Sequence, residues 1–250
     1  MLVPDRRRML LVELRRLGSA QVEQLAEVLA VSSSTVRRDL AMLEDEGLLT
    51  RAHGGAYVRG AVRPDAAPAR HAENDAKQRI GRSAAQRVHD GMTIMILAGS
   101  TTEAMLPHLA RRSITVVTNG LDIGHTLAAE PDITLVMLGG VLHREQMTLL
   151  GPLTEQNMAD LHVDVMFAGA WGISVDAGVT GAKVIQAGYH HSMLQHTDAL
   201  VVLADATKFG RRGPTLLADV EQVEAFITDQ NAPGPMVRDL RNRGADVVTC

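Results

Sequence analysis

The feature that most constrains the fold is an alternation of short apolar runs with helical segments from residue 93 to residue 248. The first run, 93–97, is continuously apolar in character, as expected of a strand that is buried on both faces. Six further strands are predicted at 114–118, 134–138, 163–168, 199–204, 225–228 and 246–248. Because strands separated by helices pair in parallel, the sequence predicts a parallel α/β sheet.

The loop after the first strand is a candidate ligand site, because ligands of parallel sheets bind beyond the carboxyl ends of strands. Residues 99–102, Gly-Ser-Thr-Thr, combine a glycine, three hydroxyls and a helix N-terminus. Free backbone N–H groups and the helix dipole would favour an anion such as phosphate there. A capped turn that binds nothing would have the same residues, so both interpretations stay open. The chain has no Walker A or strict GxGxxG pattern, which disfavours nucleotide sites.

The first sixty residues have a different pattern, three amphipathic helices followed by a short hairpin. Apolar residues recur at helical spacing in 6–17 and 22–29, and a third helix begins after Ser32, a suitable N-cap. Short apolar runs at 48–51 and 56–58 flank a tight turn that contains glycines. Together these elements predict a winged helix-turn-helix.

The third helix has two dissimilar faces. Its apolar face carries Val36, Leu40 and Leu43, and its opposite face carries Ser34, Arg37, Arg38 and Ala41. Hydroxyl residues at the first turn followed by two arginines suit insertion into the major groove of DNA. The expected DNA contacts, including two from the hairpin, are Ser33, Ser34, Thr35, Arg37, Arg38, Arg51 and His53. A helical bundle with a merely solvated arginine face is the alternative.

Charge gives weak support to a DNA-binding head. Residues 1–63 contain ten arginines and eight acids, whereas the remainder contains fifteen basic and twenty-one acidic residues. A slightly basic head on an acidic body suits a polyanion partner. Asp39 would repel phosphate, so we expect it to orient an arginine or to bond within the head rather than to touch DNA.

Residues 22–56 resemble the N-terminal signature of the DeoR family of transcriptional regulators. The matching residues are Ser32, Thr35, Arg37, Arg38, Asp39, Leu40, Leu43, Glu44, Gly47, Arg51, His53, Gly54, Gly55 and Ala56. The body, from about Lys77 to Asp229, is similar to the sensor domain of that family. This resemblance implies a DNA-binding head and an α/β sensor domain with a fold like that of ribose-5-phosphate isomerase.

The resemblance also implies a pocket for a phosphorylated sugar or a related metabolite. The residues that it places around this pocket are Gly99, Ser100, Thr101, Thr102, Asn119, Gly139, Gly140, Arg144 and Lys208. Lys208 is the favoured cation for phosphate or for a sugar hydroxyl, with a surface lysine beside a turn as the alternative. The implied regulator represses carbohydrate-metabolism genes and leaves its operator when the effector binds.

Three positions depart from the family pattern. Leu97 stands where the family usually has an aspartate, Trp171 where it often has an acid, and Gln186 opens a segment where Glu-Ala-x-x-Lys is common. These changes remove charge from the region that would contact a polyhydroxy ligand. The sequence therefore leaves the identity of the effector open.

Catalytic and metal-binding alternatives receive less support. A sugar-phosphate isomerase needs a carboxylate base, and the corresponding loop, 168–172, contains no acid, although Asp164 and Asp176 lie nearby in sequence. The closest histidines are His190, His191 and His196, whose spacing is poor for metal ligation on a helix. We therefore expect no enzyme, no cofactor and no metal. A DNA-binding regulator that needs no ligand remains the third alternative.

The predicted organisation is a winged helix-turn-helix at 1–60, a linker at 61–76 that is rich in Ala, Pro and charge, and an α/β effector-binding and oligomerisation domain at 77–250. The expected partners are double-stranded operator DNA and further copies of the chain, as a homodimer or homotetramer. No apolar run is long enough to span a membrane. The single cysteine, Cys250, permits no internal disulfide, and we expect a cytoplasmic protein.

Overall fold

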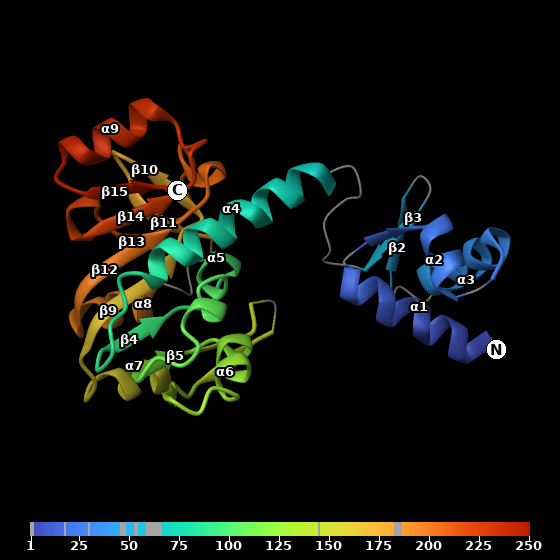
Figure 1. The fold of residues 1–250 in the computed structure, drawn as a ribbon, viewed down its shortest axis with the longest axis horizontal. Coiled ribbons are helices and arrows are strands. Elements are labelled where there is room, and N and C mark those ends of the chain that lie inside the picture. Colours follow the sequence, from blue (N-terminus) through green and yellow to red (C-terminus); the bar gives the residue numbers. More distant parts are fainter. Residues whose placement is uncertain are drawn as a thin grey trace. The chain divides into compact units, whose positions relative to one another are not determined.

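The computed structural model describes residues 3–17, 19–29, 31–45, 49–52, 55–58, 67–144, 146–182 and 187–250. The chain forms two compact units, Met1–Ala72 and Glu73–Cys250 (Figure 1). No helix within these described ranges is long and apolar enough to cross a membrane.

The first unit consists of three helices and a small antiparallel sheet. The helices are α1 (Val3–Leu17), α2 (Val22–Leu29) and α3 (Ser33–Asp45), and the strands are β1 (Ser19–Gln21), β2 (Leu49–Ala52) and β3 (Gly55–Val58). The strand order is β1-β3-β2. The predicted helices and hairpin are confirmed. Strand β1 was not predicted, because its three residues have no apolar alternation and pair only with the distant β3.

Apolar residues of all three helices bury one another in the first unit. Leu10 of α1, Leu25 of α2 and Leu40 of α3 are among the largest fully buried side chains. Leu49 of β2 and Ala56 of β3 close the same cluster. The helical spacing of these leucines therefore packs α3 with one face inward and leaves its other face exposed.

A seven-stranded parallel sheet organises the second unit. Its strands are β4 (Thr93–Ile96), β5 (Ile114–Thr118), β6 (Ile133–Met137), β9 (Val163–Gly169), β12 (Thr197–Leu203), β14 (Ala225–Thr228) and β15 (Asp246–Thr249). All seven predicted strands are present. The strand order is β15-β14-β12-β9-β4-β5-β6, and every neighbouring pair is parallel. The chain thus extends the sheet from β4 in one direction, then returns to β9 and extends it in the other.

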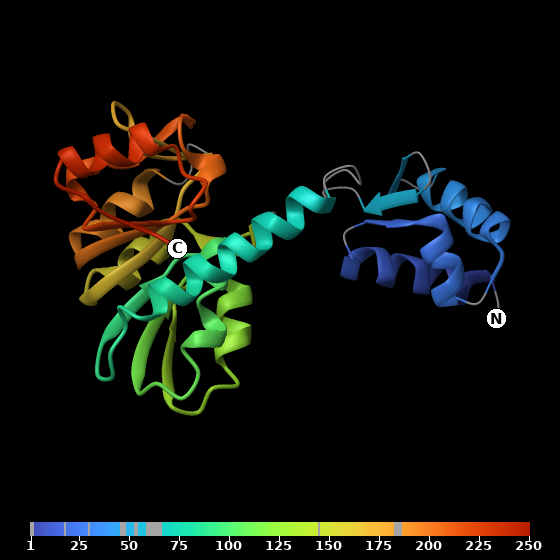
Figure 2. The same ribbon diagram turned by 45° about the horizontal axis from the view of Figure 1, so that its top comes forward.

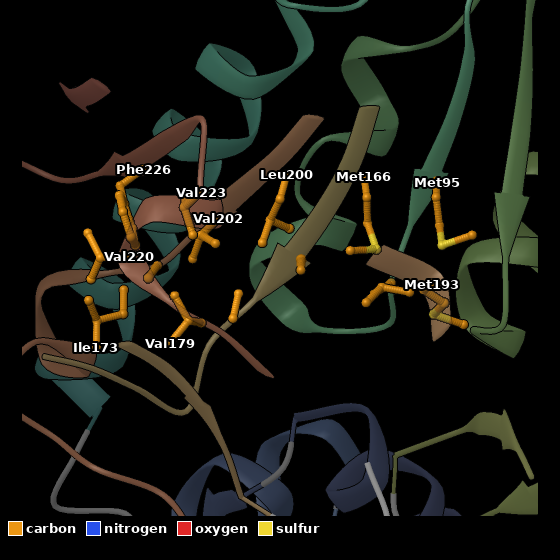
Figure 3. Packing of buried hydrophobic residues seen from close by; sticks show 14 of the residues in the cluster. Met95, Met166, Ile173, Val179, Met193, Leu200, Val202, Val220, Val223 and Phe226 are labelled. Carbon is orange, nitrogen blue, oxygen red and sulfur yellow. The ribbon is translucent and has the colours of Figure 1, made fainter. Parts of the chain in front are cut away.

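Each face of this sheet carries its own apolar cluster, because successive residues of a strand point to opposite faces. On one face Ile94 and Ile96 pack with helical residues of α4 (Ala67–Ala85), α6 (Leu121–Leu127) and the short turn η2 (Leu106–His108). On the other face Met95, Met166 and Leu200 pack with residues of α7 (Pro152–Met158), α8 (Ala187–Gln195) and α9 (Gly234–Asn242) (Figures 2 and 3).

A smaller antiparallel sheet covers part of the second face. It consists of β10 (Gly172–Ser174), β11 (Gly178–Gly181) and β13 (Thr215–Ala218), in the order β10-β11-β13. Ile173 and Val179 project from it into the same cluster as Phe226 of the large sheet (Figure 3). Strands β7 (Val141–His143) and β8 (Thr148–Leu150) form a hairpin that is a separate two-stranded sheet. None of these short strands was predicted.

Within the predicted linker at 61–76, residues 67–76 are helical and belong to α4. Residues 61–66 lie outside the described ranges. Pro68 stands in the first turn of this helix. A proline costs no intrahelical hydrogen bond there, because the first N–H groups of a helix have no partner within it.

Candidate functional site

Helix α3 presents the face that was predicted for DNA. Val36, Leu40 and Leu43 are buried against α1 and α2, whereas Arg37 and Arg38 are exposed. The N-terminus of the helix is capped by Ser32, whose Oγ accepts a hydrogen bond from the Thr35 N–H at 3.2 Å. The cap was predicted, and the hydroxyls of Ser34 and Thr35 also bond to Ser32 Oγ, at 2.9 and 2.8 Å. Polar groups therefore gather at the exposed first turn.

The two arginines of α3 differ in their surroundings. Arg37 Nη2 lies 3.3 Å from Glu23 Oε1 of α2, and both side chains are mostly exposed. Such a surface ion pair contributes little free energy and is screened by salt, so it leaves Arg37 able to exchange Glu23 for a phosphate. Arg38 is exposed on the next position of the helix. Ser33 is the first residue of α3. The side chain of Arg51 and the whole of His53 lie outside the described residues.

Asp39 lies on the inner side of α3 and bonds within the head, as expected. It is 2% exposed, and its carboxylate accepts hydrogen bonds from Arg6 Nη2 at 3.3 Å and Arg7 Nε at 3.4 Å. The hydrogen bond to Asp39 raises the pKa of Arg6. Both arginines belong to α1, so Asp39 connects the helix that carries the candidate DNA contacts to α1.

A cavity of about 320 Å³ opens at the carboxyl ends of β4, β9 and β12, the three central strands of the large sheet. All strands run parallel, but after β6 the chain crosses back and adds β9 on the other side of β4. Ligands of open α/β sheets bind at the point where the order of strands reverses in this way. The described residues that line the cavity are Leu97, Ala98, Gly99, Ser100, Thr101, Gln146, Gly169, Ala170, Trp171, Gly181, Ala182, His190, Lys208 and Leu217.

Four of the nine residues predicted for a ligand line this cavity: Gly99, Ser100, Thr101 and Lys208. The first three follow β4: Gly99 is the N-cap of α5 (Ser100–Glu103), a helix of a single turn, and Ser100 and Thr101 are its first two residues. Lys208 follows β12 in the short turn η4 (Ala206–Lys208). The sheet therefore brings together two segments that lie about a hundred residues apart in the sequence.

Two buried aspartates shape the turn that carries Lys208. Asp205 Oδ1 accepts hydrogen bonds from the Thr207 N–H at 2.9 Å and from the Thr207 hydroxyl. Asp229 Oδ2 accepts from the Ala206 N–H at 3.1 Å. Lys208 Nζ lies 3.9 Å from Asp205 Oδ2, and the lysine side chain is 22% exposed. The ammonium is therefore held near the cavity with one buried carboxylate beside it.

The other five predicted ligand residues do not line the cavity, and the hydrogen bonds of three of them show what they do instead. Thr102 Oγ1 donates to the carbonyl oxygens of Leu97 and Gly99, both at 2.7 Å, and so closes the turn after β4. Asn119 Nδ2 donates to the Leu149 carbonyl at 3.1 Å and holds the β7–β8 hairpin. The Gly139 N–H donates to Asn157 Oδ1 of α7 at 2.8 Å.

Gly140 and Arg144 complete this set. Gly140 has a φ of 150°, and a Cβ at this position would lie 2.4 Å from Thr154 Oγ1, so only glycine fits there without a shift of its neighbours. Arg144 is exposed in the β7–β8 hairpin. Gly139 and Gly140 therefore allow the backbone geometry of their loop and do not line the cavity.

The family of the chain follows from comparison with known proteins. Residues 6–60 match the model of the DeoR-like helix-turn-helix domain, and residues 72–230 match that of the DeoR C terminal sensor domain. The chain belongs to the DeoR family. It is a transcriptional regulator of the DeoR type, with an N-terminal helix-turn-helix and a C-terminal parallel α/β domain.

Its DeoR-type relatives match along most of their length. It is 30% identical to the HTH-type transcriptional regulator GlpR of Haloferax volcanii, over 99% of this chain and 98% of the relative. It is 31% identical to the HTH-type transcriptional repressor GlcR of Bacillus subtilis, over 88% of this chain and 86% of the relative. Among solved structures, ribose 5-phosphate isomerase A of Methanocaldococcus jannaschii is 20% identical, with a TM-score of 0.39 and 54% of each chain covered.

Two departures from the DeoR pattern, Leu97 and Trp171, line the cavity of this DeoR-type chain, while Gln186 lies outside the described residues. His190 of α8 also lines it, and sequence reasoning had assigned this histidine no ligand role. Burial lowers the pKa of His190 to about 4, so its imidazole is neutral at physiological pH. Gln146 was missed as well, because no pattern in the sequence indicates that the β7–β8 hairpin approaches the cavity.

Proposed function

We propose that this DeoR-type regulator is a repressor that binds operator DNA through α3. A phosphorylated sugar, bound in the cavity at the carboxyl ends of β4, β9 and β12, releases it from the operator. The observation that supports the effector site is the convergence of the Gly99–Thr101 loop and Lys208 at the reversal point of the sheet. Hydroxyls and a half-buried ammonium are suitable groups for a phosphoryl group and for sugar hydroxyls. The predicted domain limits of 1–60 and 77–250 are part of this proposal.

The regulatory step requires that the effector prefer one arrangement of the protein over another. Two copies of the chain in a dimer or tetramer would supply two α3 helices to a palindromic or repeated operator. An effector that binds the DNA-free arrangement more tightly would then weaken operator binding. A coupling free energy of about 1–3 kcal/mol, or roughly 5- to 150-fold in affinity, is typical for such a link.

An isomerase-like enzyme is the alternative, and the positions of the acids disfavour it. Asp164 lies at the start of β9, where its Oδ2 accepts a hydrogen bond from the Thr93 N–H at 2.7 Å, far along the strand from the carboxyl end. Asp176 is exposed and lies 3.6 Å from Arg243. Neither aspartate lines the cavity, and no acid is among its described lining residues. Aldose–ketose interconversion would need such a base near the substrate.

The test measures operator binding and effector response in separate assays. Purified protein is screened by thermal shift against phosphorylated sugars and polyols, and each compound that stabilises it is added to an operator-binding titration. We expect Ser100→Ala and Lys208→Met to bind the operator like the wild type but to lose most of the response. Removal of one charged hydrogen bond of about 1.5–3 kcal/mol corresponds to roughly 10- to 150-fold more effector.

A matched control is Arg238→Gln, which removes an exposed charge from α9 and touches no residue of the cavity. This variant should respond like the wild type. If both Ser100→Ala and Lys208→Met also respond normally, the proposed cavity is not the effector site. If no compound shifts the unfolding temperature or the operator affinity, the regulator works without such a ligand, which is the remaining alternative.

A further inference from the structure

Trp171 lines the cavity with an exposed side chain, which core packing does not explain. Its side chain is 48% exposed, although tryptophan is the largest apolar side chain. The apolar clusters on both faces of the sheet are formed by other residues. It lies two residues beyond Gly169, the carboxyl end of β9, and lines the same cavity as Ser100 and Lys208. An exposed indole beside polar groups is typical of a ligand platform, because it offers apolar area at little cost in side-chain entropy.

The backbone around Trp171 is held by several hydrogen bonds. The Trp171 N–H donates to the Thr180 carbonyl of β11 at 2.9 Å. Thr180 Oγ1 donates to the Gly172 carbonyl at 3.0 Å and accepts from the Gly213 N–H at 2.9 Å. A Cβ at Gly213 would lie 2.1 Å from the Gly181 carbonyl oxygen and 3.1 Å from Trp171 Cδ1, so glycine is required by the close backbone and also leaves room for the indole edge. The backbone segment that carries the indole is therefore held in place before any ligand arrives, which lowers the cost of binding.

We infer that Trp171 stacks on the apolar C–H face of a sugar ring, so that the effector is a ring-form sugar phosphate rather than an open-chain polyol phosphate. The face of an indole carries negative charge density and attracts C–H groups or cations. Lys208 disfavours a ligand cation, because it places a positive charge in the same cavity and no acid is among the described lining residues. A volume of about 320 Å³ suits a single sugar phosphate.

This inference rests on the proposed function, since it assigns a ligand class to the same cavity. Trp171 is the one tryptophan of the chain, so tryptophan fluorescence reports on this site alone. The experiment titrates full-length wild-type protein with pairs of compounds of equal carbon number. These are the 6-phosphates of glucose, galactose and mannose and the corresponding open-chain alditol phosphates, with inorganic phosphate as a further probe. Fluorescence and release from operator DNA are both recorded.

The variants are Trp171→Leu, which keeps an apolar side chain without a flat ring, and Trp171→Phe, which keeps a smaller ring. We expect at least one ring phosphate to change the fluorescence and to release DNA at lower concentration than its open-chain partner. Trp171→Leu should then need about tenfold more of it, and Trp171→Phe less than about threefold more. Leu216→Ala, another exposed apolar residue of the small sheet that lies outside this cavity, should match the wild type.

The outcomes separate this inference from the proposed function. If an open-chain phosphate releases DNA as well as its ring partner, or if Trp171→Leu responds like the wild type, the stacking role is refuted while the effector site stands. If a ring phosphate releases DNA without any change in wild-type fluorescence, the same conclusion follows. If neither this series nor the phosphorylated sugars and polyols of the thermal-shift screen affect DNA binding or fluorescence, the proposed function fails, and the inference fails with it. Should Trp171→Leu not fold, the stacking role is tested by the effector response of Trp171→Phe and by the fluorescence change of the wild type.

Discussion

His190 should make the α/β unit lose stability as the pH falls from 7 to 5. This side chain is 8% exposed in the apolar wall between α8 and the sheet, and burial lowers its pKa from 6.5 to about 4. Between these two values the unfolded chain binds a proton at His190 and the folded chain does not. Stability is therefore fully present above pH 6.5 and is lost as the pH falls toward 4.

The magnitude follows from the two pKa values. A shift of one unit corresponds to about 1.4 kcal/mol, so the full difference is roughly 3 kcal/mol, which is reached below both pKa values. Between pH 7 and pH 5 the loss is about 2 kcal/mol, because at pH 5 the unfolded His190 is almost fully protonated and the folded one is almost fully neutral. Other groups titrate in the same range, so the effect must be measured as a difference between variants.

The assay is urea unfolding at pH 7 and pH 5, followed by the fluorescence of Trp171, which belongs to the same unit as His190. His190→Gln removes the titration but keeps a neutral polar side chain. We expect the wild type to lose about 2 kcal/mol more than this variant over the interval. His191→Gln, an exposed neighbour on α8, should keep the pH dependence of the wild type. Equal pH dependence of the wild type and His190→Gln would refute the reasoning.

Three further predictions follow from the site and the fold. Arg38→Ala should weaken operator binding and lower the slope of log affinity against log salt by about one, as measured by titration at several salt concentrations; an unchanged slope would remove Arg38 from the phosphate contacts. Asp39→Asn should weaken operator binding although it removes no DNA contact, because α3 loses its charged connection to α1; unchanged affinity and unchanged thermal unfolding would contradict this role. Gly140→Ala should lower the unfolding temperature of the second unit, because its φ of 150° and the nearby Thr154 hydroxyl leave no room for a Cβ; an unaltered temperature in calorimetry would show that the loop can move aside.

The sequence by itself determined the parts of this protein that depend on local spacing. The short, mainly apolar runs predicted all seven strands of the large sheet, since strands covered on both faces are rich in apolar residues. Helical spacing predicted the buried face of α3, and with it the exposed position of Arg37 and Arg38. Ser32 was predicted as the cap because a hydroxyl before a helix can accept a free N–H.

Only the tertiary structure decided which side chains meet. Strand β1 and the sheet β10-β11-β13 were missed, because three- and four-residue strands are stabilised by distant partners rather than by their own pattern. Of the nine residues predicted for a ligand, four line the cavity, and Trp171, His190 and Gln146 line it with them. The physical reason is that the order of strands sets which loops are neighbours, and that order puts β4 beside β9 and β9 beside β12. The hydrophobic periodicity of the sequence does not predict which strands pair. A cavity formed by the ends of three strands can therefore be identified only from the folded sheet.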